Sequence, residues 1–278
     1  MKLHSGIFVA GVGALVLGST AAGAERAVTV PIQILGNFPV VNATIEGNTV
    51  PLIFDLGDDS ALVLSQAVID RVKAMPTGET QRMKDLEGHV IQSPKFKIPR
   101  LQIGDALFTD VVWRRDAHDP AFPADEVGQQ GYLGTSLLMA YRVVLDYRHR
   151  TMTLIPPESA DSRSAHCKGA AVPFSPHWHG EPITTAHTDF GELTLVWDTG
   201  APVSIIRKAR AQAAGAVVSN DTVTTKRLIL GGVDFGPLTF QQLEYAEPAG
   251  TDAFIGYDFF AKHVVCIDFP GKRFLIKK

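Results

Sequence analysis

Hydrophobic and polar residues in this chain follow the pattern of β-strands along most of its length. Residues 28–34 and 39–45 alternate between apolar and polar side chains, as half-buried strands do, and the second run leads into a turn at Glu46-Gly47-Asn48. Helical periodicity is scarce, and the pattern favours a short helix over residues 65–74 with Ser65 as its N-cap. We therefore expect a mainly β protein with short helices.

Two hydrophobic runs share an unusual plan, because each is interrupted by an acid and a glycine. Residues 193–197 lead into Asp198-Thr199-Gly200, residues 50–54 lead into Asp55-Leu56-Gly57, and an apolar run follows in both cases. Both stretches predict a strand, a tight turn and a second strand. A surface Asp-x-Gly turn is one explanation. A buried site is the other, since an Asp that ends an apolar strand needs hydrogen-bond donors or a second acid with which to share a proton.

The repeated plan extends beyond the two aspartates, which lie 143 residues apart. The further matched pairs, in the same order in both halves, are 101–104 with 228–231, 132–139 with 254–260, and 143–155 with 265–276. The spacing from Gly134 to Asp146 is 12 residues, and that from Gly256 to Asp268 is also 12. These matches indicate an internal duplication.

Each half resembles a retropepsin-type aspartic protease domain. The shared marks are Asp-Thr/Ser-Gly after an apolar strand, then two hydrophobic residues and a glycine, a short helix and a closing hairpin. The resemblance covers residues 28–156 and 170–278. It implies two β-barrel domains in tandem, at 25–156 and 170–278, related by a pseudo-twofold axis. The run of prolines and serines between the halves predicts a linker at 157–169.

The resemblance implies that Asp55 and Asp198 form a catalytic pair that acts on peptide or protein substrates. Two carboxylates held about 3 Å apart cannot both ionise, so they share one proton and titrate as a pair. One carboxylate then acts as general base on a water, while the protonated one polarises a peptide carbonyl. This chemistry needs no metal, cofactor or covalent intermediate, and we expect none.

Five further residues are expected to support the pair. Gly57 and Gly200 allow the backbone to approach the carboxylates closely. Gly134 and Gly256 belong to the second motif of each half. The resemblance also implies that the hydroxyl of Thr199 reaches across to the other half and holds the two turns together.

The first half departs from the family pattern at two positions. Leu56 stands where the pattern has Thr or Ser, and it cannot make the crossing hydrogen bond, which leaves a polar group unmet at a cost of about 1–3 kcal/mol. Asp58 adds an acid where a small residue is usual, and its charge is expected to raise the pKa values of the pair. Pro202 is a milder change in the second half.

Residues 76–89 are polar and hold Gly78 and Gly88. The resemblance implies a hairpin here that folds over the cleft as a flap. An ordinary solvated hairpin is the alternative.

The beginning of the chain has the shape of a secretory signal peptide. Lys2 is followed by an uncharged apolar run at 7–17 and by small residues at 22–24. An uncleaved membrane anchor is the alternative, but the run is short and rich in Gly and Ala for a spanning helix. We expect residues 1–24 to be removed and the protein to be exported, to the periplasm or out of the cell.

Charge and composition exclude some partners. Without Lys2 the mature chain carries 25 basic against 29 acidic residues, a balance of −4. Such a chain has no basic field for nucleic acid, and we expect no membrane partner once the signal is cleaved.

Two cysteines and a group of histidines are the other candidates for chemistry. Cys167 and Cys266 lie in the same half and are a candidate disulfide in an oxidising compartment, with two buried thiols as the alternative. His177-Trp178-His179, with His187 nearby, suggests zinc, but no cluster of acids or cysteines completes four ligands. We therefore interpret these histidines as exposed loop residues and predict no metal site.

Three functional hypotheses follow. The first is an exported aspartic endopeptidase, active as a monomer whose halves close on each other. The second is a catalytically weakened or inactive descendant that binds peptide in the same cleft. The third is a homodimeric enzyme that pairs two copies of Asp198 while the first half is structural. We favour the first because Asp55 and Gly57 are kept on the expected strand.

Overall fold

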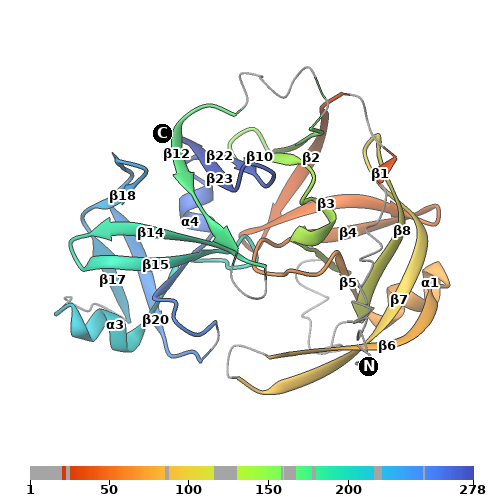
Figure 1. Cartoon of the computed structure of the whole chain (residues 1–278), viewed down its shortest axis with the longest axis horizontal. Coiled ribbons are helices and arrows are strands. Elements are labelled where there is room, and N and C mark those ends of the chain that lie inside the picture. The colour runs from red at the N-terminus through yellow and green to blue at the C-terminus, as the bar shows by residue number, and fades with distance from the viewer. Residues whose placement is uncertain are drawn as a thin grey trace, which may run out of the picture.

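The computed structural model of the chain consists mainly of strands, arranged in two lobes (Figure 1). The structure describes residues 21–22, 26–84, 88–115, 130–157, 159, 167–176, 180–215, 221–246 and 248–278. Most of the predicted signal segment 1–24, most of the linker 157–169 and the histidines His177 and His179 lie outside the described residues. In the described part, no helix is both long and apolar enough to span a membrane.

The first lobe is built from a series of antiparallel hairpins. Its elements are β1 (Ala21–Ala22), β2 (Val28–Leu35), β3 (Phe38–Ile45), β4 (Asn48–Phe54), β5 (Leu62–Leu64), α1 (Gln66–Val72), β6 (Met75–Lys84), β7 (Val90–Ile103), β8 (Ala106–Arg115), β9 (Gly131–Leu133), the 3-10 helix η1 (Thr135–Leu137), β10 (Arg142–Asp146) and β11 (Thr151–Ile155). Helix α1 starts after Ser65, whose hydroxyl accepts a hydrogen bond from the Val68 amide at 3.4 Å, and it ends where Lys73 adopts a left-handed φ of 53°.

The second lobe repeats this order in a shorter form. Its elements are β12 (Ala170–Pro173), β13 (Ser175–Pro176), β14 (Pro182–Thr188), β15 (Gly191–Trp197), β16 (Ile205–Arg207), α3 (Lys208–Ala213), β17 (Thr222–Thr225), β18 (Leu228–Leu230), β19 (Val233–Asp234), β20 (Leu238–Leu243), β21 (Ala253–Ile255), α4 (Tyr257–Phe260), β22 (Val264–Asp268) and β23 (Arg273–Lys277). The prediction of a mainly β, duplicated acid-protease-like fold is therefore confirmed.

The closing hairpins of the two halves meet in one sheet. Hairpin β10–β11 pairs with hairpin β22–β23 through β10 and β22, which run antiparallel with Val144 opposite Cys266. The strand order β2-β11-β10-β22-β23-β12 is symmetric about this central pair. The two lobes are therefore joined by backbone hydrogen bonds within a single chain.

The same three-strand arrangement surrounds each aspartate. Strand β4, which ends just before Asp55, runs parallel to β9, and β9 is antiparallel to β5. In the second lobe β15, which ends just before Asp198, runs parallel to β21, and β21 is antiparallel to β16. Because β9 and β21 carry the second motif of each half, the repeated motifs become neighbours in space.

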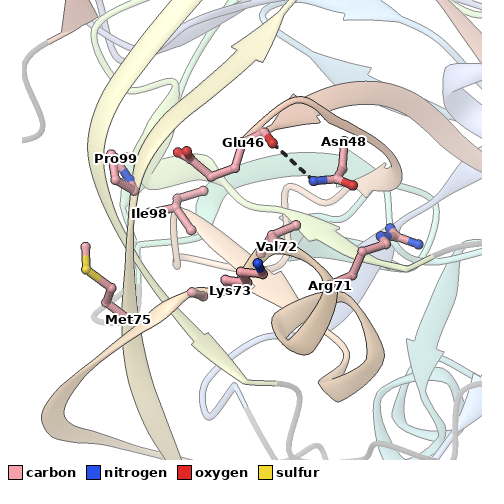
Figure 2. A pocket seen from close by; sticks show the side chains of 9 residues that line it. Glu46, Asn48, Arg71, Val72, Lys73, Met75, Ile98 and Pro99 are labelled. Carbon is pink, nitrogen blue, oxygen red and sulfur yellow. Dashed lines mark hydrogen bonds between the residues drawn. The ribbon is translucent and has the colours of Figure 1, made fainter.

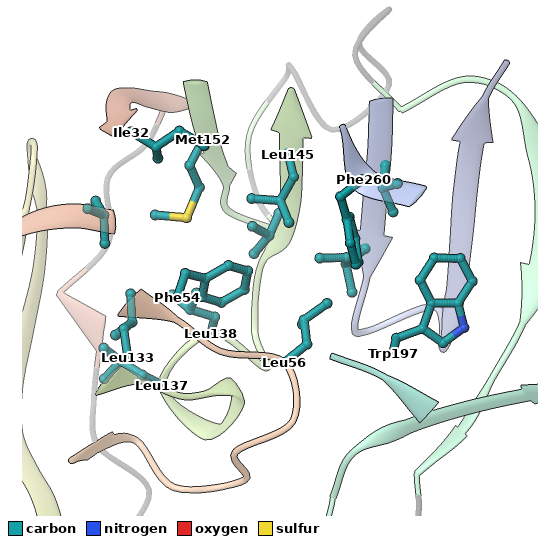
Figure 3. Close-up of a cluster of buried hydrophobic side chains, with 14 of the residues drawn as sticks. Ile32, Phe54, Leu56, Leu133, Leu137, Leu138, Leu145, Met152, Trp197 and Phe260 are labelled. Carbon is teal, nitrogen blue, oxygen red and sulfur yellow. The ribbon is translucent and has the colours of Figure 1, made fainter. Parts of the chain in front are cut away.

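A continuous hydrophobic core runs through both lobes. It includes Phe54 and Leu56 from the first lobe and Trp197 and Phe260 from the second. Figure 3 shows Leu56 between Phe54 on one side and Phe260 on the other. A disulfide between Cys167 and Cys266 also ties the chain before β12 to strand β22.

Candidate active site

Asp55 and Asp198 occupy equivalent turns at the ends of β4 and β15. The Asp55 amide donates to the carbonyl of Leu133 at 2.9 Å, and the Asp198 amide donates to the carbonyl of Ile255 at 3.0 Å. The Gly57 amide donates to Asp55 Oδ1 at 2.8 Å, which holds that carboxylate against its own turn. Each aspartate is thus fixed by the strand that carries the second motif of its half.

The structure brings the two carboxyl groups face to face across the boundary between the lobes. A Cβ atom added to Gly57 would lie 2.8 Å from Cγ of Asp198, and one added to Gly200 would lie 2.6 Å from Cγ of Asp55. Each carboxyl therefore packs directly against the glycine of the opposite turn. A larger residue at either glycine would occupy the space that the carboxyl fills. The two carboxyls are also hydrogen-bonded to each other.

Burial raises the pKa values of both acids. Burial raises the pKa of Asp55 well above its usual range, and the charges of Asp198 and Asp58 raise it further. Burial also raises the pKa of Asp198, but the hydrogen bond from Asp55 and the amides of Gly200 and Ala201 oppose that rise. The two carboxyls therefore share a proton and titrate as a pair.

Thr199 links the two turns from the second lobe. Its side chain is fully buried, and its hydroxyl donates to the carbonyl of Phe54 at 2.6 Å and accepts from the Leu56 amide at 3.0 Å. Leu56, at the equivalent position of the first lobe, is also fully buried, but its side chain packs in the core shared by the lobes. Only the second lobe therefore supplies a side-chain hydroxyl that bonds to the opposite turn. The first lobe contributes the apolar packing of Leu56 instead.

The extra acid Asp58 is paired with a cation. Its carboxylate accepts hydrogen bonds from Arg114 and from the amide of Ser60, the latter at 2.8 Å. Arg114 lies on β8 and is itself buried, with 8% of its surface exposed. The charge of Asp58 still raises the pKa of both site acids, in the direction expected from the sequence.

Gly134 and Gly256 pack against the returning chain of each turn. An added Cβ at Gly134 would lie 2.2 Å from the carbonyl oxygen of Ser60, and one at Gly256 would lie 2.4 Å from that of Val203. Both positions require glycine because backbone atoms fill the space that a side chain would need.

Sequence reasoning missed the hydrogen-bonded residues that support the two aspartate turns. Ser204 donates from its hydroxyl to Asp258 at 2.7 Å and accepts from the Gly256 amide at 3.0 Å. Arg114, which neutralises Asp58, lies 56 residues away from it in the sequence. Neither pair recurs in the other half of the chain, so the duplication carries no signal for them.

Glu181 is a buried acid that the sequence did not reveal. It precedes β14 and has 9% of its surface exposed. Burial raises its pKa to about 7, and the charges of Asp59, Asp58 and Asp198 contribute to the rise.

The hairpin of β6 and β7 extends from the first lobe toward the second (Figure 1). A Cβ added to Gly88, near the tip, would lie 3.5 Å from the Cβ of Ala246 in the second lobe. The predicted hairpin at 76–89 therefore forms and reaches the opposite lobe, whereas its role as a flap stays a prediction.

A hollow on the first lobe contains none of the site residues (Figure 2). Glu46 and Asn48 of the β3–β4 turn, Arg71 and Lys73 at the end of α1, and Ile98 of β7 are among its lining residues. Two of its charged side chains are engaged locally, since Arg71 bonds to Gln130 and Glu46 accepts from the Arg100 amide at 2.8 Å.

Within the residues that the structure describes, no group of three or more His, Cys, Asp and Glu side chains is placed to hold a metal ion. His187, the described histidine of the candidate cluster, lies 3.7 Å from the exposed Glu192.

Comparison with solved structures relates the whole arrangement to aspartic proteinases. The aspartic proteinase from Irpex lacteus superposes with a TM-score of 0.61 at 13% identity, covering 91% of this chain and 97% of that one. Basic 7S globulin from soybean (TM-score 0.57) and conglutin gamma, a basic 7S globulin from lupine seeds (TM-score 0.58), each match at 11% identity over 91% of this chain and 95% of their own. No family model and no curated protein matches the sequence. At these identities the likeness establishes the fold, which is the bilobal aspartic-protease-like fold, and leaves activity to be argued from the site.

Proposed function

We propose that this chain is an exported aspartic endopeptidase that hydrolyses peptide bonds with a water activated between Asp55 and Asp198. The observation that carries the proposal is the pair itself. Two half-buried carboxyls from opposite lobes face each other, are hydrogen-bonded and have raised pKa values. Such a pair is costly to bury and is typical of sites that use one acid and one base.

The two carboxyls take different roles in the proposed reaction. Asp198 takes the role of general base, because its buried Oδ1 has no hydrogen-bond partner among the described residues and can accept a hydrogen bond from a water. Asp55 keeps the proton and donates a hydrogen bond to the carbonyl oxygen of the substrate. As the water attacks the carbonyl carbon, Asp198 takes its proton and Asp55 gives its own to the carbonyl oxygen, which forms a neutral tetrahedral intermediate. The C–N bond then breaks as Asp198 passes its proton to the leaving nitrogen and Asp55 recovers a proton from a hydroxyl of the intermediate.

The contacts between the lobes favour a monomeric enzyme. Both acids come from one chain, and β10 pairs with β22 across the middle of the molecule. The proposed site therefore needs no second copy of Asp198. Export rests on the sequence of residues 1–24 alone, and peptide or protein as substrate rests on the resemblance and the fold.

A non-catalytic peptide-binding protein is the second candidate. Two observations favour it, namely Leu56 in place of a crossing hydroxyl and the two neighbours of the same fold that are named globulins rather than proteinases. Thr199 still links the turns from one side, which is why we rank the endopeptidase first.

Cleavage of an unfolded protein by the purified mature chain tests the proposal. We expect hydrolysis at acidic pH that a statine-type transition-state mimic inhibits and that both Asp55→Asn and Asp198→Asn abolish. Asp110→Asn is the matched control, since Asp110 is an exposed acid on β8 that pairs only with Lys97 in the described part. Full cleavage by either dyad variant would contradict the proposal, and a folded wild-type chain that binds the mimic without cleaving would favour the second candidate.

A further inference from the structure

The β2–β3 hairpin of the first lobe reaches the catalytic turn of the second lobe. At the tip of this hairpin, the side-chain amide of Asn37 donates to the carbonyl of Pro202 at 3.0 Å. Pro202 lies four residues beyond Asp198, in the same turn, and both partners of the bond are half-buried. The bond therefore crosses the boundary from the first lobe to the second, in the direction opposite to the bonds of Thr199.

The tip that carries Asn37 is held by the strands around it. Strands β2 and β3 pair as far as Leu35 opposite Phe38, which leaves a two-residue turn of Gly36 and Asn37. Their φ values of 55° and 73° are left-handed, as a tight hairpin turn of this kind requires, and Gly and Asn adopt them readily. Strand β2 also pairs with β11 of the sheet that joins the lobes. The amide of Asn37 is therefore fixed relative to both lobes.

The carbonyl that accepts this bond belongs to a segment tied to Asp198. The ring of Pro202 fixes its own φ, which limits the rotation of the backbone there. The preceding residue, Ala201, donates its amide to the carbonyl of Asp198 at 3.3 Å and accepts from the amide of Tyr257 in α4 at 3.0 Å. A hydrogen bond to Pro202 therefore restrains the Asp198 turn relative to the first lobe.

The duplicated counterpart of this junction has no such bond. The 143-residue offset relates Asn37 to Gly180 and Pro202 to Asp59. Gly180 has no side chain that could donate, and a Cβ added to it would lie 3.0 Å from the Cβ of Asp59. The second copy is therefore a close packing contact, and the side-chain hydrogen bond at this position comes from the first lobe alone.

The two departures from symmetry complement each other. At the motif position the second lobe has the hydroxyl of Thr199, whereas the first lobe has Leu56. At the hairpin position the first lobe has the amide of Asn37, whereas the second lobe has Gly180. Each lobe therefore supplies one side chain that bonds to the opposite catalytic turn.

We propose that Asn37 is a positioning residue of the catalytic pair, whose side-chain amide holds the Asp198 turn against the first lobe and so replaces the crossing hydrogen bond that Leu56 cannot make. This inference rests on the proposed endopeptidase function and adds a residue to the support of the same site.

Replacing Asn37 with Gly tests the role of the amide, because glycine keeps the left-handed turn and removes only the side chain. We expect kcat to fall on the order of tenfold, which corresponds to one hydrogen bond of about 1.4 kcal/mol, with KM unchanged because Asn37 acts through the turn. Asn48→Ala is the matched control, since the amide of Asn48 donates to the carbonyl of Glu46 at 3.1 Å within its own hairpin. Its kcat should equal that of the wild type.

Two further readouts distinguish positioning from a purely structural role. In a Leu56→Thr chain, which regains a hydroxyl in the first lobe, Asn37→Gly should lower kcat by a smaller factor than it does in the wild type. Loosening of the turn should also weaken the coupling between the carboxyls, so the two limbs of the pH profile of kcat/KM should move toward each other in Asn37→Gly. All rates are measured below the unfolding transition.

A wild-type rate and pH profile in Asn37→Gly would overturn the inference. An equal loss of kcat in both backgrounds with neither limb moved would do the same. Binding of a statine-type mimic separates this inference from the proposed function. In a chain that binds the mimic but cleaves nothing, the peptidase is refuted, and weaker binding by Asn37→Gly than by Asn48→Ala would keep the positioning role. Hydrolysis that Asn37→Gly leaves unchanged would refute the positioning role alone.

Discussion

Replacing Thr199 with Val removes the hydrogen bonds of Thr199 to the Asp55 turn while keeping the shape of the side chain. The hydroxyl of Thr199 makes two hydrogen bonds in a fully buried position, to the carbonyl of Phe54 and from the amide of Leu56. Both backbone groups would lose this partner, and each unmet group costs about 1–3 kcal/mol. We therefore expect Thr199→Val to lower the free energy of unfolding by about 2–6 kcal/mol.

The same change should lower activity more than it lowers stability. The two hydrogen bonds fix the turn that follows Asp55, so their loss lets the carboxyls move relative to each other. Misplacement by about 1 Å can cost on the order of 100-fold in rate. We expect kcat to fall by at least that factor, measured below the unfolding transition so that the folded fraction is unchanged.

Urea unfolding at constant pH and steady-state kinetics measure the two effects. Thr185→Val is the matched control, because Thr185 lies exposed on β14. It should change the free energy of unfolding by less than about 0.5 kcal/mol. A Thr199→Val chain with wild-type stability and rate would refute the idea that this one-sided contact holds the pair.

Three further predictions concern neighbouring residues. Leu56→Thr restores the missing hydroxyl but removes apolar volume from a fully buried position. Urea unfolding should therefore show a free energy of unfolding that is lower by about 1–2 kcal/mol, and a higher value would refute this view of the packing. Gly57→Ala puts a methyl group 2.8 Å from Cγ of Asp198, so the proteolytic activity should fall to the level of Asp198→Asn. Gly47→Ala, at a turn where an added Cβ meets no atom within 4 Å, is the control and should stay active. Glu181 has a pKa raised from 4.5 to about 7 in the folded chain, so its protonation favours folding below pH 4.5 and that contribution is lost as the pH rises to 7. The loss is at most about 3 kcal/mol, and urea midpoints of Glu181→Gln should lack this part of the pH dependence.

The duplication explains why the fold and the two aspartates could be predicted from sequence. Asp55 and Asp198, with Gly134 and Gly256, recur at matching intervals, and only a symmetric pairing of the halves brings both copies of the pattern together. The strand pairings that carry these residues depend on local apolar runs, which the sequence displays directly.

Other parts of the site depend on how loops dock, which no local pattern encodes. Arg114 meets Asp58 across the first lobe, and Gly180 meets Asp59 across the boundary between the lobes. Arg114 and Gly180 are each a single polar or small residue in a stretch without a motif. The burial of Glu181 in particular follows from the closure of one lobe on the other, so its altered pKa could not be read from its surroundings in the sequence.

Titration of the two aspartates by carbon-13 NMR tests the central claim most directly. With the side-chain carboxyl carbons labelled, we predict that Asp55 and Asp198 titrate as a pair with widely separated apparent pKa values. In Asp198→Asn the pKa of Asp55 should fall, because a nearby negative charge is gone. Two independent titrations near the ordinary value, unchanged when the other aspartate is replaced, would contradict the account.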